Sequence, residues 1–413
     1  MEFKTILVVT DGILSDGTGS GVTLGNLFQG WDLDKFALYS VENDRLNGGI
    51  LQGHDCFNKA INSQNCKYEK KLKNKGWLNY FKVLVAKSGI RPYLTLIAPI
   101  VIKDQAVRDI KNLQPQIIFG PASDIYSIRR LLKIKKLTNA RLGIIFFDDL
   151  IDRYDNLIFS RVYKWIHLKF LKYVISVARF TYVCSEAMRE EYESIFGVKF
   201  YVVSNPVDLE KVRAYRPVAP RSMPLKIVYA GTVNSKNISN LKMMGKAVKY
   251  LADCGHSVFL DIYTFATKLE FVQSQFQEFG NNVEVRLAPI EDHELFAILG
   301  QASILYIPMD FTDESIKSIR LSYLTKQPLY MALGVPLIVH GPLSIHVVEH
   351  ALKHRYAEVI TDKSVDVLAK NILRHIEDYN GFIKATEFGL EYARNFHSIN
   401  KVQLKFYERL LLN

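Results

Sequence analysis

Thr325 and Lys326 stand at the expected start of a helix in the C-terminal half of the chain. A helix start presents backbone N–H groups and the positive end of the helix dipole, which favour a bound phosphate, and a lysine adds a point charge. Ser318 and Arg320 precede the pair, and an arginine matches the geometry of phosphate oxygens. These residue types predict a phosphate contact. The alternative is that the side chains lie on an ordinary solvated surface.

Two adjacent carboxylates, Asp148 and Asp149, follow an expected strand at Leu142–Phe147. A carboxylate there could orient a hydroxyl group or accept its proton, and clustered carboxylates can raise one another's pKa. The alternative is a helix N-cap with an acid in the first turn. The histidines show no ligand spacing, because His346 and His350 are four apart without further partners, so we expect no metal site.

Strands and helices alternate along both halves of the chain, which predicts an α/β protein with two Rossmann-like, doubly wound domains. Continuous apolar runs such as Lys4–Thr10 are typical of strands buried on both faces of a parallel sheet. A second series of this kind begins at Lys226–Ala230. Two such domains in tandem form a cleft, and ligands bind at the carboxyl ends of their strands.

The expected domain boundaries follow from a proline-containing segment. Pro217, Pro220 and Pro224 interrupt a stretch with little apolar periodicity, which predicts a linker at 211–224. The N-terminal domain would then cover 1–210 and the C-terminal domain 225–385. A C-terminal helix in 386–413 is expected to pack back on the N-terminal domain.

The chain has 413 residues, a formal charge of +11 and a pI of about 9.2, a balance that favours anionic partners. Its four cysteines form no CxxC pair, which excludes the common zinc and redox motifs and favours a reducing, cytoplasmic setting. No uncharged apolar run is long enough to span a membrane. Nucleic-acid binding would rest on charge alone, because no nucleic-acid-binding module is visible.

Two segments, Lys67–Lys87 and Arg161–Tyr173, combine basic residues with tryptophan, tyrosine and phenylalanine. This combination suits an anionic membrane surface, and we expect peripheral association with the inner face of a membrane. The alternative is an ordinary solvated helix face.

Several segments together resemble the GT-B glycosyltransferases, in particular the retaining family 4-like enzymes that build bacterial surface polysaccharides. Thr325–Ile338, which reads TKQPLYMALGVPLI, is similar to the family pattern S/T-K-x-x-E-Y-M-A-x-G-x-P-V-I. Ser185–Tyr192 is similar to the family's SE-x-M helix, and Asn205–Asp208 to its N-G-V-D segment before the linker. The resemblance extends over most of the chain in a shared order.

The resemblance implies roles for two loops. The glycine-rich loop after the first strand would face the cleft, although a plain turn has the same composition. The segment Tyr229–Asn237 would lie over the phosphates of a nucleotide-sugar donor, and the helix at Thr325 would contact its diphosphate and ribose. The first loop contains Gly17, Thr18, Gly19, Ser20 and Gly21; the expected donor-binding residues are Gly231, Thr232, Asn234, Lys236, Tyr263, Ser318, Arg320, Thr325 and Lys326.

The chain departs from the family at its usual carboxylates. Leu321 and Leu329 stand where a Glu-x7-Glu pair is expected, and the nearest acids are Asp313 and Glu314. Ile145 stands where the family has a cleft histidine, so Asp148 and Asp149 become the expected catalytic residues. Loss of a buried hydrogen-bond partner typically costs about 1–3 kcal/mol, so the departure bears on activity.

The resemblance implies a glycosyltransferase that moves a sugar from a nucleotide-diphosphate sugar to a saccharide or lipid-linked acceptor, with retention of configuration. It requires no cofactor beyond the donor substrate. Two alternatives remain open: a GT-B partner or scaffold subunit without turnover, and another GT-B enzyme such as a sugar-nucleotide epimerase.

Overall fold

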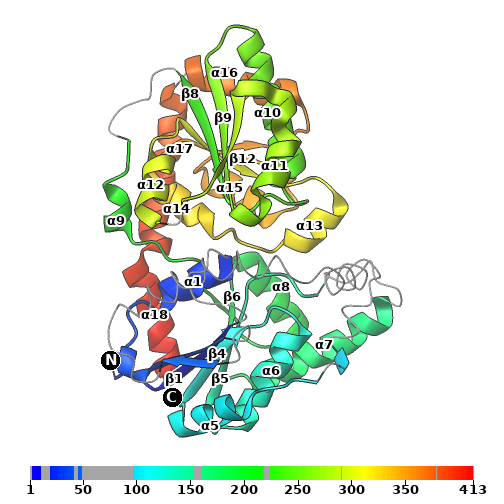
Figure 1. Cartoon of the computed structure of the whole chain (residues 1–413), viewed down its shortest axis with the longest axis vertical. Coiled ribbons are helices and arrows are strands. Elements are labelled where there is room, and N and C mark those ends of the chain that lie inside the picture. The colour runs from blue at the N-terminus through cyan, green and yellow to red at the C-terminus, as the bar shows by residue number, and fades with distance from the viewer. Residues whose placement is uncertain are drawn as a thin grey trace. The chain divides into compact units, whose positions relative to one another are not determined.

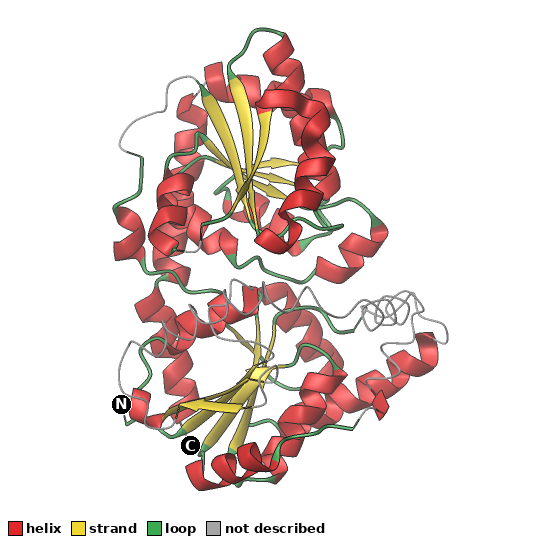
Figure 2. Ribbon diagram, viewed as in Figure 1, coloured by secondary structure: helices red, strands yellow, loops and turns green. Residues whose placement is uncertain are grey.

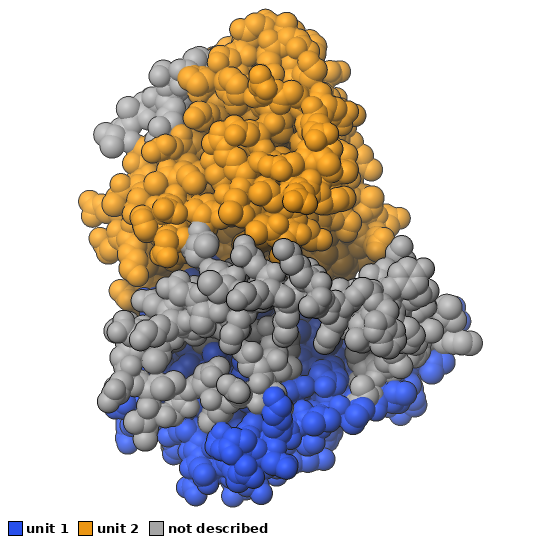
Figure 3. All heavy atoms as spheres, viewed as in Figure 1, with its two compact units in different colours: residues 1–205, 403–413 blue, residues 206–402 orange. Residues whose placement is uncertain are grey.

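The computed structural model describes residues 2–10, 19–40, 45–48, 96–97, 99–151, 160–217, 224–289, 291–377 and 379–412. The chain divides into two compact units, coloured separately in Figure 3. Unit 1 comprises Met1–Asn205 and Gln403–Asn413, and unit 2 comprises Pro206–Val402. Gly17, Thr18 and the basic segment Lys67–Lys87 lie outside the described residues.

Unit 1 contains a seven-stranded sheet in the order β3-β2-β1-β4-β5-β6-β7 (Figure 1). Neighbouring strands pair in parallel except β2 and β3, which are antiparallel. The strands are β1 (Ile6–Thr10), β2 (Phe36–Ser40), β3 (Arg45–Gly48), β4 (Ile117–Pro121), β5 (Arg141–Phe146), β6 (Phe180–Val183) and β7 (Tyr201–Val202). The helices are α1 (Gly19–Phe28), α5 (Asp104–Leu113), α6 (Ile125–Lys136), α7 (Ser160–Val177) and α8 (Glu186–Phe196), with a short 3₁₀ turn at Leu33–Lys35.

Local sequence signals explain where several of these helices begin and end. Asp124 and Ser127 form a reciprocal capping box at the start of α6. Ser185 caps α8 by accepting a hydrogen bond from the Met188 backbone N–H at 3.0 Å. Gly197 ends α8 with a φ of 68°, a left-handed conformation that glycine adopts without steric cost.

Unit 2 contains a six-stranded, fully parallel sheet in the order β10-β9-β8-β11-β12-β13, the Rossmann order with one reversal point. The strands are β8 (Leu225–Ala230), β9 (Val258–Thr264), β10 (Val283–Leu287), β11 (Ile304–Pro308), β12 (Leu337–His340) and β13 (Glu358–Ile360). The helices are α9 (Leu209–Arg213), α10 (Ile238–Asp253), α11 (Leu269–Phe276), α12 (Asp292–Gly300), α13 (Asp313–Ile319), α14 (Lys326–Leu333), α15 (His346–His354), α16 (Val365–Glu377) and α17 (Tyr379–Tyr392). Helix α18 (Ile399–Leu411) begins in unit 2 and continues into unit 1 from Gln403. Two 3₁₀ turns (Ala266–Lys268 and Gln277–Asn282) and a π-helical turn (Ala393–His397) complete the unit.

Both faces of the unit 2 sheet are buried, with helices on either side (Figures 1 and 2). Side chains alternate along β8: Val228 and Ala230 join the apolar cluster under α12, α14 and α15, whereas Ile227 and Tyr229 join the cluster under α10, α11 and α16. This explains the continuous apolar strands that the sequence shows. The predicted fold class, α/β with two Rossmann-like units, is confirmed.

The boundaries between the two units differ from those expected from the sequence. The units divide after Asn205, and α9 lies inside the segment 211–224 that was expected to be a linker. Val212 of α9 is fully buried, and the Arg216 Nε donates to the Ala332 carbonyl at 2.9 Å, so residues up to 217 pack as part of unit 2. The return to unit 1 comes at Gln403 rather than at 386.

The returning segment packs in the core of unit 1. Phe406 is buried among the rings of Phe28, Phe119 and Tyr182, with centroids 5.1–5.3 Å away. The Tyr407 hydroxyl donates to the Leu27 carbonyl at 2.8 Å. Among the helices that the structure describes, none combines the length and apolar composition of a bilayer span.

Candidate functional site

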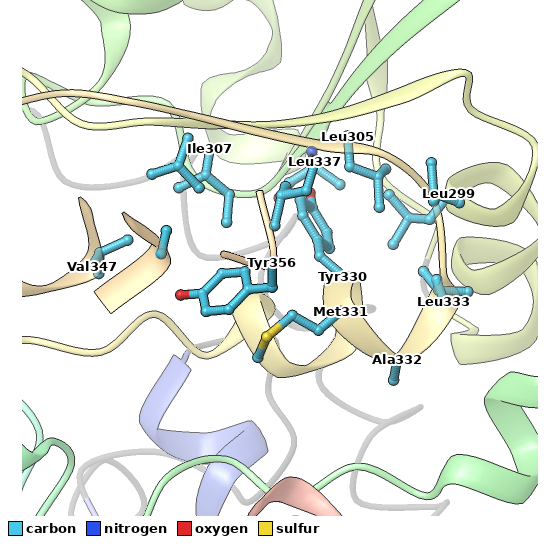
Figure 4. Close-up of a cluster of buried hydrophobic side chains, with 14 of the residues drawn as sticks. Leu299, Leu305, Ile307, Tyr330, Met331, Ala332, Leu333, Leu337, Val347 and Tyr356 are labelled. Atoms are coloured by element: carbon cyan, nitrogen blue, oxygen red, sulfur yellow. Dashed lines mark hydrogen bonds between the residues drawn. The ribbon is translucent and has the colours of Figure 1, made fainter. Parts of the chain in front are cut away.

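Helix α14 is fixed by the apolar core beneath it. Tyr330, Met331 and Leu333 point into a buried cluster with Leu305 and Leu337 of the sheet (Figure 4). Gly334 ends the helix with a φ of 66°, as its sequence position predicts. Because the body of α14 is buried, the position of Lys326 at its first turn is well defined.

Lys326 reaches from α14 over the end of strand β8. Its Nζ donates to the Ala230 carbonyl at 2.8 Å and lies 4.0 Å from the centroid of the Tyr229 ring. Since α14 packs on one face of the sheet and the Tyr229 ring lies on the other, the lysine side chain passes across the end of β8 at Gly231. A Cβ at Gly231 would collide with the Lys326 Nζ, so glycine is required for this path.

Burial lowers the pKa of Lys326 to about 7. The ammonium has no carboxylate within ion-pairing distance among the described residues; its partners are a carbonyl and an aromatic ring. Such a cation, at the start of a helix, is suited to an anion.

The loop after β8 is closed by its own side chains. The Tyr229 hydroxyl donates to the Thr232 carbonyl at 2.7 Å and accepts from the Asn237 Nδ2 at 3.0 Å. The Asn237 Oδ1 accepts from the Asn234 N–H at 3.0 Å, and the Asn234 Oδ1 accepts from the Lys236 N–H at 2.9 Å. The predicted donor residues Gly231, Thr232, Asn234 and Lys236 therefore share one ordered loop.

Neighbouring elements brace this loop. The Ser315 hydroxyl of α13 donates to the Ser235 carbonyl at 3.3 Å, and the Asp310 N–H donates to the Lys236 carbonyl at 2.8 Å. Ser318 lies one turn further along α13, where its hydroxyl donates to the Ser315 carbonyl at 2.8 Å. Arg320 follows α13, and its carbonyl accepts from the His346 N–H at 2.8 Å, which joins α13 to α15.

Tyr263, near the carboxyl end of β9, lies beside the loop because β9 pairs with β8. Its carbonyl accepts from the Gly231 N–H at 2.9 Å, and its hydroxyl accepts from the Arg286 Nη1 at 3.2 Å. Arg286, at the end of β10, also pairs with Glu284, and that hydrogen bond raises the arginine's pKa. The sequence prediction did not include Arg286; its place near the carboxyl end of an expected strand was the available signal.

The two leucines at the expected carboxylate positions make apolar contacts. Leu321 is buried, and Leu329 packs against the same cluster as the buried side of α14. Asp313 and Glu314 are exposed in the first turn of α13. The position of Leu329 thus contributes to holding α14 on the sheet.

Asp148 and Asp149 differ in their surroundings. Asp148 is exposed, whereas Asp149 is buried. The Asp149 Oδ1 accepts from the Ile151 N–H at 2.9 Å and from the Tyr192 hydroxyl at 3.4 Å. Burial and the nearby Asp149 raise the pKa of Tyr192, which keeps the phenol neutral as a donor. Asp149 therefore orders the turn that presents Asp148.

The described part of the glycine-rich loop belongs to a helix. Gly19, Ser20 and Gly21, which were expected to belong to the loop, form the first turn of α1. Gly21 is buried, and the Thr23 hydroxyl donates to the Gly19 carbonyl at 2.9 Å.

His346 and His350 lie in a buried cluster with tyrosines. The His350 Nδ1 lies 2.9 Å from the Tyr356 hydroxyl, and its Nε2 lies 2.8 Å from the Tyr392 hydroxyl. Within the described ranges, no group of three or more histidine, cysteine or acidic residues has a metal-binding arrangement.

No protein-family model and no curated protein sequence matches the chain. Solved structures do match along the full length. Anabaena HepE in complex with UDP and glucose is similar with a TM-score of 0.59 at 12% identity, covering 100% of both chains. A glycosyltransferase from Rickettsia africae is similar with a TM-score of 0.60 at 13% identity, again covering 100% of both chains.

A putative UDP-N-acetylglucosamine 2-epimerase from Listeria monocytogenes is also similar, with a TM-score of 0.53 at 9% identity, covering 98% of this chain and 95% of that chain. At such low identities these likenesses show the fold alone, which is the two-domain α/β architecture of the GT-B proteins.

Proposed function

We propose that this protein is a glycosyltransferase that uses a nucleotide-diphosphate sugar as donor. The observation that carries the proposal is Lys326: a half-buried lysine without a carboxylate partner in the described structure, placed at the first turn of α14 beside the loop at Gly231. Two similar proteins support it, one a glycosyltransferase and one solved with UDP and glucose.

Lys326 would neutralise the diphosphate as its bond to the sugar breaks. Negative charge grows on the leaving phosphate in that step, and a preorganised cation in a buried site stabilises the growing charge more than water does. Lys236, Arg320 and the N–H groups near Gly231 and Thr325 are proposed to assist. Transfer with retention of configuration is part of the proposal and follows from the family resemblance.

The acceptor is proposed to be a saccharide or lipid-linked sugar in bacterial surface polysaccharide synthesis. Asp148 is the carboxylate proposed to orient the acceptor hydroxyl, because it is exposed at the carboxyl end of β5. Asp149 supports it through the turn that its Oδ1 orders.

A nucleotide-sugar screen tests the donor. UDP-, GDP-, dTDP- and CMP-sugars are added at millimolar levels, and thermal stability is measured. A ligand at 100 times its Kd stabilises the folded state by about 2.7 kcal/mol, so the correct donor raises Tm by several degrees. If no nucleotide diphosphate stabilises the protein, the proposal fails.

Substitution of Lys326 tests the phosphate contact. Lys326→Ala is expected to lower kcat/KM for sugar transfer by about 100-fold, since removing one charge-stabilising group typically costs about 2.7–4 kcal/mol. The matched control is Lys249→Ala, which removes an exposed lysine of α10 that pairs with Asp253. Equal turnover in both variants would refute the assignment.

A sugar-nucleotide epimerase is the second candidate, favoured by the likeness to the Listeria protein. Incubation of UDP-N-acetylglucosamine with the protein alone separates the two: an epimerised nucleotide sugar without any acceptor supports the epimerase. A donor that binds but reacts with neither water nor acceptor supports a partner without turnover.

A further inference from the structure

We infer that Tyr229 is the positioning residue of the donor site, holding both the Lys326 ammonium and the loop 231–237. This inference rests on the proposed function. A single buried side chain would then fix the cation and the backbone that are proposed to contact the diphosphate. Nothing in the residue type of Tyr229 distinguishes it from an ordinary strand tyrosine.

The ring of Tyr229 contacts the Lys326 ammonium. With Nζ 4.0 Å from the ring centroid, the geometry is that of a cation–π contact, which is stronger in a desolvated place than in water. The other partner of Nζ is the Ala230 carbonyl at 2.8 Å. Ala230 is itself held in place, because its N–H donates to the Tyr330 hydroxyl at 3.1 Å. The ammonium thus has one defined position.

The hydroxyl of Tyr229 closes the loop. Its two partners, the Thr232 carbonyl and the Asn237 amide, belong to the loop, and Asn237 also donates to the Thr232 carbonyl at 2.9 Å. Tyr306, a buried tyrosine on neighbouring β11, shows the contrast. Its hydroxyl contacts the Asn240 carbonyl and His340, away from the loop and from Lys326. The contacts of Tyr229 are therefore those of a site residue rather than of core packing alone.

In this arrangement, donor binding is expected to be coupled to the uptake of a proton by Lys326. The titratable groups around the ammonium are the phenols of Tyr229 and Tyr330, both kept neutral because burial raises their pKa. With its pKa near 7, Lys326 is partly uncharged in the empty site, and a bound diphosphate favours the charged form. Donor binding then takes up about half a proton at pH 7, and Kd rises by up to about tenfold per pH unit between the pKa of the empty site and the higher pKa of the donor-bound site.

The experiment measures binding of UDP-glucose, whose phosphates do not titrate near neutral pH, by calorimetry in buffers of different ionisation enthalpy. Three variants are compared with wild type: Tyr229→Leu, Tyr229→Phe and the control Tyr306→Phe. Hydrogen exchange of residues 231–237 is followed in each.

Tyr229→Leu removes the ring, so Lys326 is free to turn to water and its pKa returns toward the ordinary value. We expect a roughly tenfold weaker Kd at pH 7 and loss of proton uptake at pH 8. Tyr229→Phe keeps the ring, so proton uptake persists, while Kd weakens about threefold to fivefold and the loop exchanges faster. Tyr306→Phe is expected to lower Tm without either change.

If both Tyr229 variants keep the Kd, proton uptake and loop exchange of the wild type, the inference is overturned and Tyr229 has only a packing role. Absence of UDP-glucose binding by the wild type, together with a negative nucleotide-sugar screen, refutes the proposed function instead. The two failures are thus distinguishable.

Discussion

At position 231, the space that a side chain would fill is occupied by the Lys326 ammonium. The backbone there also has a φ of 144°, which residues with a Cβ rarely adopt. Glycine is therefore required twice, once for the backbone conformation and once for the path of the lysine across the sheet.

Gly231→Ala is expected to weaken UDP-glucose binding about tenfold, because the added Cβ displaces Lys326 from the site. Backbone strain costs on the order of 1–3 kcal/mol and should lower Tm as well. Gly255→Ala is the matched control: Gly255 has a φ of 91°, but a Cβ there meets nothing within 4 Å. Calorimetry and thermal unfolding of both variants separate strain from site damage. Equal affinity in the two variants would contradict the expected role of Gly231.

The residue types predicted Lys326 and Gly231 as members of the site, but they did not predict the role inferred for Tyr229. A lysine at a helix start and a glycine loop after a strand carry their chemistry in their identity, so Lys326 and Gly231 could be expected to share a site. Tyr229 could not, because its role depends on a lysine from the opposite face of the sheet reaching its ring. Such a crossing has no sequence signature.

Helix α7 presents a basic and aromatic face. Its sequence has four basic residues and no acidic one. Val162 and Trp165 are each 57% exposed and Tyr173 is 50% exposed, on the same side as the exposed Arg161, Lys169 and Lys172. The Lys169 Nζ lies 3.7 Å from the centroid of the Trp165 ring. This composition is the one on which the sequence-based expectation of association with an anionic membrane surface rests.

Flotation with vesicles that contain anionic lipid tests this face of α7. We expect salt-sensitive binding that weakens roughly fivefold in Lys169→Ala, since a lysine near an anionic surface contributes about 1 kcal/mol. Trp165→Ser should weaken it further by removing an interfacial ring. Tyr250→Ser, which removes a tyrosine of α10 that is 54% exposed, is the control and should bind as wild type does. Equal binding to neutral and anionic vesicles would rule out the electrostatic role.

At the level of elements, apolar periodicity predicted the strands and helices well and the junctions poorly. The expected strands at Leu142–Phe147 and Lys226–Ala230 agree with β5 and β8 to within one residue at each end. The expected linker includes α9, because the few apolar side chains there, such as Val212, pack against unit 2 rather than against each other along one helix face. A short helix held by tertiary contacts leaves little periodic signal.

Across the whole molecule, histidines with strongly lowered pKa values gather in unit 2. Burial lowers the pKa of His350 to about 2, of His397 to about 3 and of His375 to about 4. For His350, the charges of neighbouring histidines add to the effect of burial. The tyrosines around the cluster, including Tyr323, Tyr356 and Tyr392, come from distant parts of the sequence, so spacing alone could not predict it.

Acid is therefore expected to destabilise unit 2. A histidine whose pKa is lower in the folded state than its ordinary 6.5 leaves stability intact above pH 6.5, and stability falls as pH drops below that value toward the folded-state pKa. Each such histidine removes about 1.4 kcal/mol per pH unit well below 6.5. Hydrogen exchange at pH 5 and 7.5 should show lost protection in unit 2, and His375→Asn should reduce proton uptake on unfolding at pH 5 by about one. His293→Asn, at an exposed position of α12, is the control. The same proton uptake in wild type and His375→Asn would mean that His375 already carries its proton in the folded protein.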